Sequence, residues 1–187
     1  MMAASPESPL ESPLARAEGY RAARRGFIAA CEKAHIDTVA RLHPSKPADN
    51  KPLFTDAAAL GPRHAARAAL VVARGRRGSA VMIELLRTGL TPPWAPPAGT
   101  RVVLVHALEP AGFAGANVTP GWPAAMLGAV ATEDLSRVRE LAVLPLEDGE
   151  DLRPALCDTL PKAVLTFLPR ADNCAAADAA IKSFLAR

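Results

Sequence analysis

Hydrophobic positions in the first third of the chain follow a helical spacing and then an extended one. In residues 14–34, apolar side chains such as Tyr20 and Phe27 recur on one side, which predicts an amphipathic helix. Apolar and polar residues then alternate over residues 35–43, and a second short apolar segment covers residues 53–60. We expect these two segments to be strands that pair as an antiparallel hairpin with a long loop.

Two continuous apolar segments follow, residues 68–73 and 101–107, and both have the length of fully buried strands. Between them, residues 78–88 carry apolar side chains at helical spacing, and Gly89 supplies a stop signal. A strand, a helix and a strand in this order predict a βαβ unit with a right-handed crossover. We therefore predict that the two strands are parallel, central, and adjacent or nearly so.

The second half of the chain continues the alternation. Residues 140–146 and 163–168 are predicted to be buried strands, and residues 122–131 and 172–186 are predicted to be helices. Alternating strands and helices indicate the α/β class, here with a mixed, mainly parallel sheet between helix layers.

Composition supports a folded chain. Of the 187 residues, 50% are hydrophobic and 22% charged, with a net charge of only +3, which excludes a disordered protein. No apolar run approaches the roughly 20 residues that a membrane span needs. Prolines are dense at the start, so we expect residues 1–15 to form a flexible Pro-rich arm and residues 16–187 a single α/β domain.

Charge and cysteine patterns exclude other classes. The basic residues are spread along the chain and aromatic residues make up 4%, so we predict no nucleic-acid partner. The three cysteines, Cys31, Cys157 and Cys174, show no metal-binding or disulfide spacing. With no apolar signal segment, we expect a protein of the cytoplasm or the mitochondrial matrix that is not secreted.

The first candidate site is the turn between the strand at 68–73 and the helix at 78–88. Arg74, Arg76 and Arg77 precede the helix, and Ser79 lies at its start. Free N–H groups at a helix start and nearby guanidinium groups favour a phosphate or a carboxylate. The turn lacks the phosphate-loop and dinucleotide motifs, so it predicts an anion site only as a hypothesis beside a solvated basic turn.

Other chemistry-bearing residues form weaker patterns. His106 and Glu109 follow a buried strand and suit acid–base chemistry or a metal, but no zinc-ligand spacing accompanies them. A hydrogen-bonded structural histidine is the favoured interpretation of His106. Four carboxylates within residues 147–151 lack the pattern of a calcium loop and indicate an acidic surface turn.

Residues 20–114 resemble a known family. The most specific segment is H-A-L-E-P-A-G-F-A at 106–114, which is similar to the H-A-L-N-P-Y-G-F-A of poorly characterised zinc carboxypeptidase-like metallohydrolases. The segments L-F-T-D-A-A-A-L-G-P at 53–62 and G-S-A-V-M-I-E-L-L-R-T-G at 78–89 also resemble that family. The resemblance implies a fold like that of carboxypeptidase A, with a mixed sheet between helix layers and zinc at the strand ends.

The chain departs from the family where the metal would bind. The family carries G-T-H-G-V-E-G, with two zinc ligands, before the helix that begins G-S, whereas this chain has A-R-G-R-R-G-S at 73–79. No histidine follows His106, although the family's third zinc ligand comes later, and family members are longer. Since zinc needs at least three protein ligands, we predict a shortened, degenerate member with no metal and no other cofactor.

These patterns lead to a preferred interpretation and two alternatives. We interpret the chain as a catalytically inactive scaffold, not an enzyme, that serves as an accessory subunit of a larger assembly. Its predicted partners are other protein subunits, which would dock on the Pro-rich arm and on the loop at 91–99. The alternatives are a hydrolase that uses His106, Glu109 or Arg76, and an anion-binding module at residues 74–79.

Overall fold

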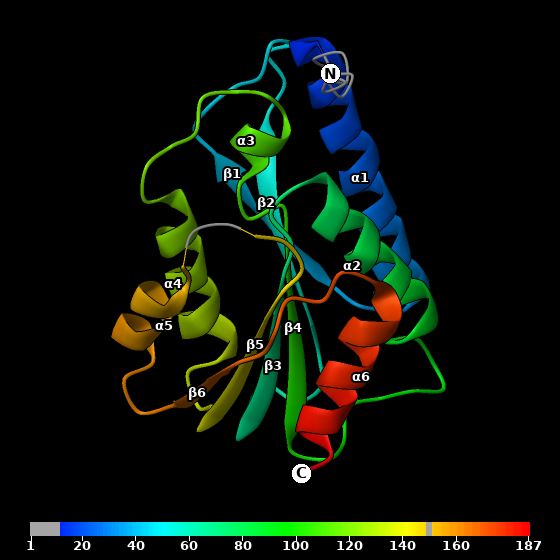
Figure 1. The fold of residues 1–187 in the computed structure, drawn as a ribbon, viewed down its shortest axis with the longest axis vertical. Coiled ribbons are helices and arrows are strands. Elements are labelled where there is room, and N and C mark those ends of the chain that lie inside the picture. The colour runs from blue at the N-terminus through cyan, green and yellow to red at the C-terminus, as the bar shows by residue number, and fades with distance from the viewer. Residues whose placement is uncertain (1–11, 149–150) are drawn as a thin grey trace, which may run out of the picture.

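The computed structural model describes residues 12–148 and 151–187, and its centre is a six-stranded sheet. The strands lie in the order β1-β2-β4-β3-β5-β6, with helices on both faces of the sheet (Figure 1). The α/β class predicted from the sequence is confirmed. The elements are α1 (Pro13–Lys33), β1 (Thr38–His43), β2 (Leu53–Leu60), β3 (Arg67–Val72), α2 (Arg76–Thr88), β4 (Thr100–His106), α3 (Pro110–Phe113), α4 (Trp122–Asp134), β5 (Glu140–Pro145), α5 (Arg153–Thr159), β6 (Val164–Phe167) and α6 (Cys174–Leu185).

The sheet is mixed and mainly parallel, as predicted. Strands β4, β3, β5 and β6 are parallel neighbours, whereas β2 pairs antiparallel with both β1 and β4. The β1–β2 hairpin and the parallel β3–β4 pair joined by α2 are therefore confirmed. Leu70 lies opposite Val103 in that central pair, and both are fully buried.

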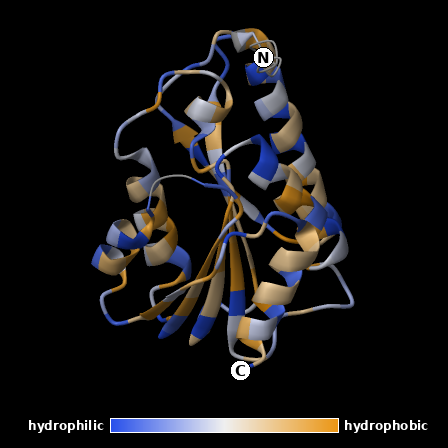
Figure 2. Ribbon diagram, in the orientation of Figure 1, coloured by the Kyte–Doolittle hydropathy of each residue, from blue (hydrophilic) through white to orange (hydrophobic). Residues whose placement is uncertain are grey.

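Alternate residues of the central strands pack against two helix layers. On one face, Val71 and Leu104 pack with α1, α2 and α6, through residues such as Phe27. On the other face, Leu70 and Val103 pack with α4 and α5. Figure 2 shows the resulting pattern, with apolar strands at the centre of the molecule and polar positions along the outer helices. Burial on both faces explains why these strands are continuously apolar.

The first helix, predicted at 14–34, spans Pro13–Lys33 and so includes the end of the predicted arm. Ser12 caps α1 by accepting a hydrogen bond of 3.2 Å from the N–H of Ala15, and Pro13 occupies the first helical position. Both residue types favour a helix start at these positions. The end of the predicted arm, residues 13–15, is therefore helical, and residues 1–11 lie outside the described residues. The division into an arm and one domain stays a prediction.

Within residues 12–148 and 151–187, no helix is both long and apolar enough to cross a lipid bilayer. The compartment stays a prediction.

Candidate functional site

A group of convergent polar residues lies at the carboxyl ends of β3, β4 and β5. A cleft of about 440 Å³ opens there, between the starts of α1 and α2 and the short helix α3. Carboxyl ends of parallel strands are the usual place of ligand sites in α/β sheets. Charged side chains from four segments of the chain line the cleft: Arg16, Arg74, Arg76, Glu109, Glu147 and Asp148.

The turn between β3 and α2 already binds a carboxylate of the same chain. The backbone N–H of Gly75 donates a hydrogen bond of 2.6 Å to Oε2 of Glu147, and the N–H of Gly78 donates to Oε1. Gly78 is required here, because a Cβ at this position would lie 2.6 Å from Cγ of Glu147. The predicted preference of this turn for an anion thus has a structural basis, and Glu147 occupies the position.

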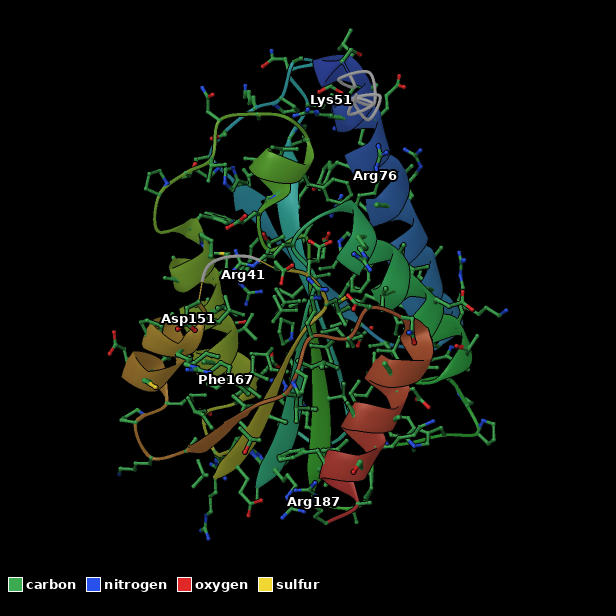
Figure 3. The ribbon with its side chains drawn as sticks, viewed as in Figure 1. Arg41, Lys51, Arg76, Asp151, Phe167 and Arg187 are labelled. Atoms are coloured by element: carbon green, nitrogen blue, oxygen red, sulfur yellow. The ribbon has the colours of Figure 1, made fainter. Side chains whose placement is uncertain are left out.

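The structure separates the four residues predicted to bind an anion. Arg74 is buried and forms an ion pair of 2.7 Å with Glu109, and Arg76 lines the outer cleft between α1 and α2 (Figure 3). Arg77 is exposed and pairs with Asp172 at 3.3 Å, away from the cleft lining. Ser79 is fully buried beneath the turn. Arg74 and Arg76 therefore belong to one cleft, and an anion site formed by all four residues stays a prediction.

The acidic segment at 147–151 is also divided. Glu147 binds the β3–α2 turn, Asp148 forms an ion pair with Arg170, and Asp151 lies near Arg153 at 4.0 Å. Glu150 lies outside the described residues. The carboxylates of the described residues in this segment thus have separate cationic or N–H partners.

A strained residue ends β4 at the edge of the cleft. Ala107 has a φ of +52°, a conformation that side-chain-bearing residues rarely adopt. The hydroxyl of Thr55 on β2 donates a hydrogen bond of 2.9 Å to the carbonyl oxygen of Ala107 and fixes this bend. Strain of this kind is concentrated at functional sites, and here it directs the chain from buried His106 to Glu109 in the cleft wall.

A buried polar chain that sequence analysis missed lies below the cleft. Oγ of Ser79 and Nε2 of His106 share a hydrogen bond of 2.6 Å, and Nδ1 of His106 lies 4.0 Å from Oδ2 of Asp56. Asp56 accepts two hydrogen bonds of 2.8 Å from the guanidinium group of Arg24. Asp56 interrupts an apolar strand, L-F-T-D-A-A-A-L, and that interruption was the signal for a buried partnered carboxylate.

Ser79, His106 and Asp56 follow one another in space as the serine, histidine and aspartate of a hydrolase triad do. Unlike the residues of an active triad, however, these three are sealed from solvent. Ser79, His106 and Asp56 are each 0% exposed, and the ring of Phe27 stacks on the His106 ring at 4.5 Å. A nucleophile must reach its substrate, and no substrate reaches a hydroxyl sealed in this way. The interpretation of His106 as a hydrogen-bonded structural histidine is confirmed, and the alternative of a hydrolase retains only Glu109 and Arg76.

Stability should depend on the protonation of His106. Burial, and to a lesser extent the charge of Arg24, lower the pKa of His106 from 6.5 to about 3. As the pH falls below 6.5, the unfolded chain binds a proton that the folded chain does not bind until about pH 3. We expect the free energy of unfolding to fall by about 1.4 kcal/mol per pH unit in this range from His106 alone.

Urea denaturation of the wild type and His106→Gln between pH 7 and pH 4 measures this effect. Glutamine keeps a partner for the Ser79 hydroxyl and does not titrate, so the stability difference between the two proteins should shrink as the pH falls. His64→Gln removes an exposed histidine and should keep the wild-type profile. Parallel profiles for His106→Gln and the wild type would refute the prediction.

The described residues do not fit a zinc site. Among residues 12–148 and 151–187, no group of three or more histidine, cysteine, aspartate and glutamate side chains could hold a metal ion. His106 is held by Ser79, Glu109 pairs with Arg74, and Glu147 binds backbone N–H groups. Guanidinium groups in the cleft wall would repel a divalent cation. We therefore derive no chemistry from a metal.

The chain matches the model of one known protein family. The model described as "Protein of unknown function (DUF2817)" matches residues 17–119, which is more than half of the chain and includes the whole segment with the resemblance noted above. No curated protein matches the chain. A carboxypeptidase A-type relationship and the degenerate status stay predictions.

Solved structures of low sequence identity are similar to the chain. The glutaminyl cyclase of Macrostomum lignano is 14% identical, with a TM-score of 0.46, and the match covers 94% of this chain and 80% of that one. The glutaminyl cyclase of Porphyromonas gingivalis is 9% identical, with a TM-score of 0.43 and coverages of 95% and 82%. The LapA aminopeptidase of Legionella pneumophila is 11% identical, with a TM-score of 0.44 and coverages of 85% and 50%.

These comparisons correct one prediction. The sequence analysis concluded that the chain is not an enzyme, and this conclusion is contradicted because the similar structures are those of enzymes, glutaminyl cyclases and an aminopeptidase. The conclusion relied on the loss of zinc ligands, which bears on one mechanism rather than on catalysis in general. At such low identities, the activities of these enzymes are not transferred to this chain.

Proposed function

The chain belongs to the DUF2817 family of proteins of unknown function, and we propose that it binds a small zwitterionic ligand, an amino acid or a short peptide, in the strand-end cleft. One observation carries the proposal: three arginines and three carboxylates from separate parts of the chain line a single cleft. The arginines can pair with the carboxylate of a zwitterion, and the carboxylates of the lining can pair with its ammonium group.

The positive side of the cleft suits the carboxylate of such a ligand. Arg16 and Arg76 come from two different helices, so two guanidinium groups line this side of the cleft. Guanidinium groups bind carboxylates through two parallel hydrogen bonds, which fixes orientation as well as charge. The Glu147 carboxylate, which accepts hydrogen bonds from the backbone N–H groups of Gly75 and Gly78, shows that this side of the cleft also binds a carboxylate through the main chain.

The negative side suits an ammonium group. Glu109, which also pairs with Arg74, and Asp148, which also pairs with Arg170, line the cleft from the loops that follow β4 and β5. A ligand with only one kind of charge meets groups of the same sign elsewhere in the cleft, which disfavours simple anions and cations. The cleft volume of about 440 Å³ lies within the range of roughly 300–1,000 Å³ typical of small-molecule sites.

Calorimetric titration with four forms of dialanine tests the proposal. We expect the free peptide to bind, and the N-acetylated and C-amidated forms to bind about ten- to a hundredfold more weakly, since each lacks one charge-assisted hydrogen-bonding group. The doubly blocked form should not bind. Hydrolysis of the free peptide is followed in the same samples by chromatography.

Two arginine variants locate the site. Arg76→Ala should weaken binding about tenfold or more, whereas Arg77→Ala is the matched control, because Arg77 is the next residue and pairs with Asp172 outside the cleft. Equal effects of the two variants, or equal binding of the free and doubly blocked peptides, would overturn the proposal. The association with other protein subunits through the Pro-rich arm and the loop at 91–99 stays a prediction.

A further inference from the structure

A second surface, which combines charged and apolar side chains, lies on the outer face of α1, away from the strand-end cleft. Leu14, Glu18, Ala22, Arg25 and Ile28 recur every three or four residues and so share one side of the helix. Leu14 is 57% exposed, and Glu18, Ala22 and Arg25 are also exposed. This stripe spans about 21 Å at 1.5 Å per residue.

Two hollows open along this stripe and meet at shared residues. One, of about 270 Å³, has an apolar floor that includes Tyr20, Ile28 and Phe54. The other, of about 500 Å³, extends toward Leu14. Both are lined by Arg21, Arg25 and Lys51, so they form one elongated surface, here called the α1 groove. Lys51 lies beside the start of α1 in Figure 3.

The floor of the α1 groove is rigid before any ligand arrives. The Tyr20 hydroxyl accepts a hydrogen bond of 2.7 Å from the N–H of Phe54 and donates one of 2.9 Å to its carbonyl oxygen. The guanidinium group of Arg24 lies 4.2 Å from the centroid of the Phe54 ring and is held there by Asp56. A preformed apolar floor lowers the entropic cost of binding.

The rim of the smaller hollow is cationic. Its lining contains Arg21, Arg24, Arg25 and Lys51 and no carboxylate among the described residues. Arg21 pairs with Asp49 and Arg24 with Asp56, whereas Arg25 and Lys51 have no ion-pair partner within residues 12–148 and 151–187. Two exposed cations thus border an apolar hollow the size of a single large side chain.

We propose that the α1 groove docks an acidic amphipathic segment of a partner protein. An apolar side chain of that segment enters the hollow, and carboxylates on either side of it meet Arg25 and Lys51. The elongation of the groove along α1 to Leu14 fits a peptide rather than a small molecule. Charge complementarity at the smaller hollow favours an acidic segment over a basic one, whereas Glu18 and Asp49 line the larger hollow.

Selection from a displayed library of random dodecamer peptides, with the full chain as bait, tests this proposal. We expect the selected peptides to contain an aromatic or aliphatic residue flanked by aspartate or glutamate. A synthetic copy of the strongest peptide should lose at least tenfold in affinity for Arg25→Glu/Lys51→Glu in 50 mM salt. The loss should be smaller in 500 mM salt, where charges are screened.

The matched control is Arg137→Glu/Lys162→Glu, which reverses the same two residue types at exposed positions outside the α1 groove. It should bind the peptide as the wild type does. The proposal is overturned if no peptide is selected, if both double variants weaken binding equally, or if a labelled single-stranded oligonucleotide binds the groove in place of acidic peptides. Thermal melting of both variants verifies that they are folded.

Discussion

Replacing Val103 by aspartate should prevent the chain from folding. Val103 is fully buried in the central strand β4, where it lies opposite Ala59 of β2 and Leu70 of β3. An ionised carboxylate at this position would have no partner, and the cost of burying it is several kcal/mol. Because typical domains are stable by only about 5–15 kcal/mol, most of the stability would be lost. Far-UV circular dichroism and urea denaturation measure this loss.

Two variants distinguish the cost of burying a charge from the cost of a cavity and from the effect of a carboxylate on an exposed strand position. Val103→Ala removes two methyl groups and should cost about 2 kcal/mol, since each buried methyl contributes about 0.8 kcal/mol plus a cavity term. Val39→Asp introduces the same carboxylate on β1, where the side chain is 51% exposed, and should change stability by about 0.5 kcal/mol or less. A folded Val103→Asp protein with near wild-type stability would contradict the buried position of β4.

Removing the guanidinium group of Arg24 should also be costly. The Asp56 side chain is only 1% exposed and accepts both of its charge-assisted hydrogen bonds from Arg24. In Arg24→Met, a buried carboxylate would remain beside His106 without its cation, and breaking a buried pair in this way costs about 3–5 kcal/mol. The free energy of unfolding, measured in urea at pH 7, should fall by that amount.

A double variant of the Arg24–Asp56 pair and a variant of a neighbouring ion pair supply the controls. Arg24→Met/Asp56→Asn removes the charge together with its partner and should recover much of the loss, because a neutral amide is cheaper to bury than a carboxylate. Arg21→Met breaks the more accessible pair with Asp49 and should cost about 1 kcal/mol or less. If Arg24→Met and Arg21→Met were equally stable, Asp56 would not depend on Arg24.

The order of strands and helices follows largely from local patterns. The apolar runs in β3 and β4 predict buried strands, and the helical spacing before Gly89 predicts α2, because each pattern reports burial of one short segment. The short helices α3 and α5 were not predicted, since a helix of 4 or 7 residues carries too few turns for a periodic signal. The helix predicted at 14–34 agrees with α1 to within one residue at each end, although the prolines before it suggested an arm and one of them opens the helix.

The candidate site was only partly visible in the sequence. The G-R-R-G turn indicated an affinity for anions, but not that Glu147, 69 positions after Gly78, provides the carboxylate. His106 was recognised as structural, yet its contact with Ser79 and its place beside Asp56 were not foreseen. The three predicted arginines differ in the structure, as Arg74 is buried, Arg76 lines the cleft and Arg77 is exposed.

The sequence by itself determined the burial of the central strands and where charged residues follow them, because hydrophobic burial depends on short-range composition and spacing. The strand predicted to be buried at 163–168 is instead the exposed edge strand β6. Only the tertiary structure decided which charges meet. The order β1-β2-β4-β3-β5-β6 brings the ends of β3, β4 and β5 side by side and sets Asp56 opposite His106 across β2 and β4. A buried carboxylate requires a partner, but strand order and register, rather than distance along the chain, decide which residue that partner is.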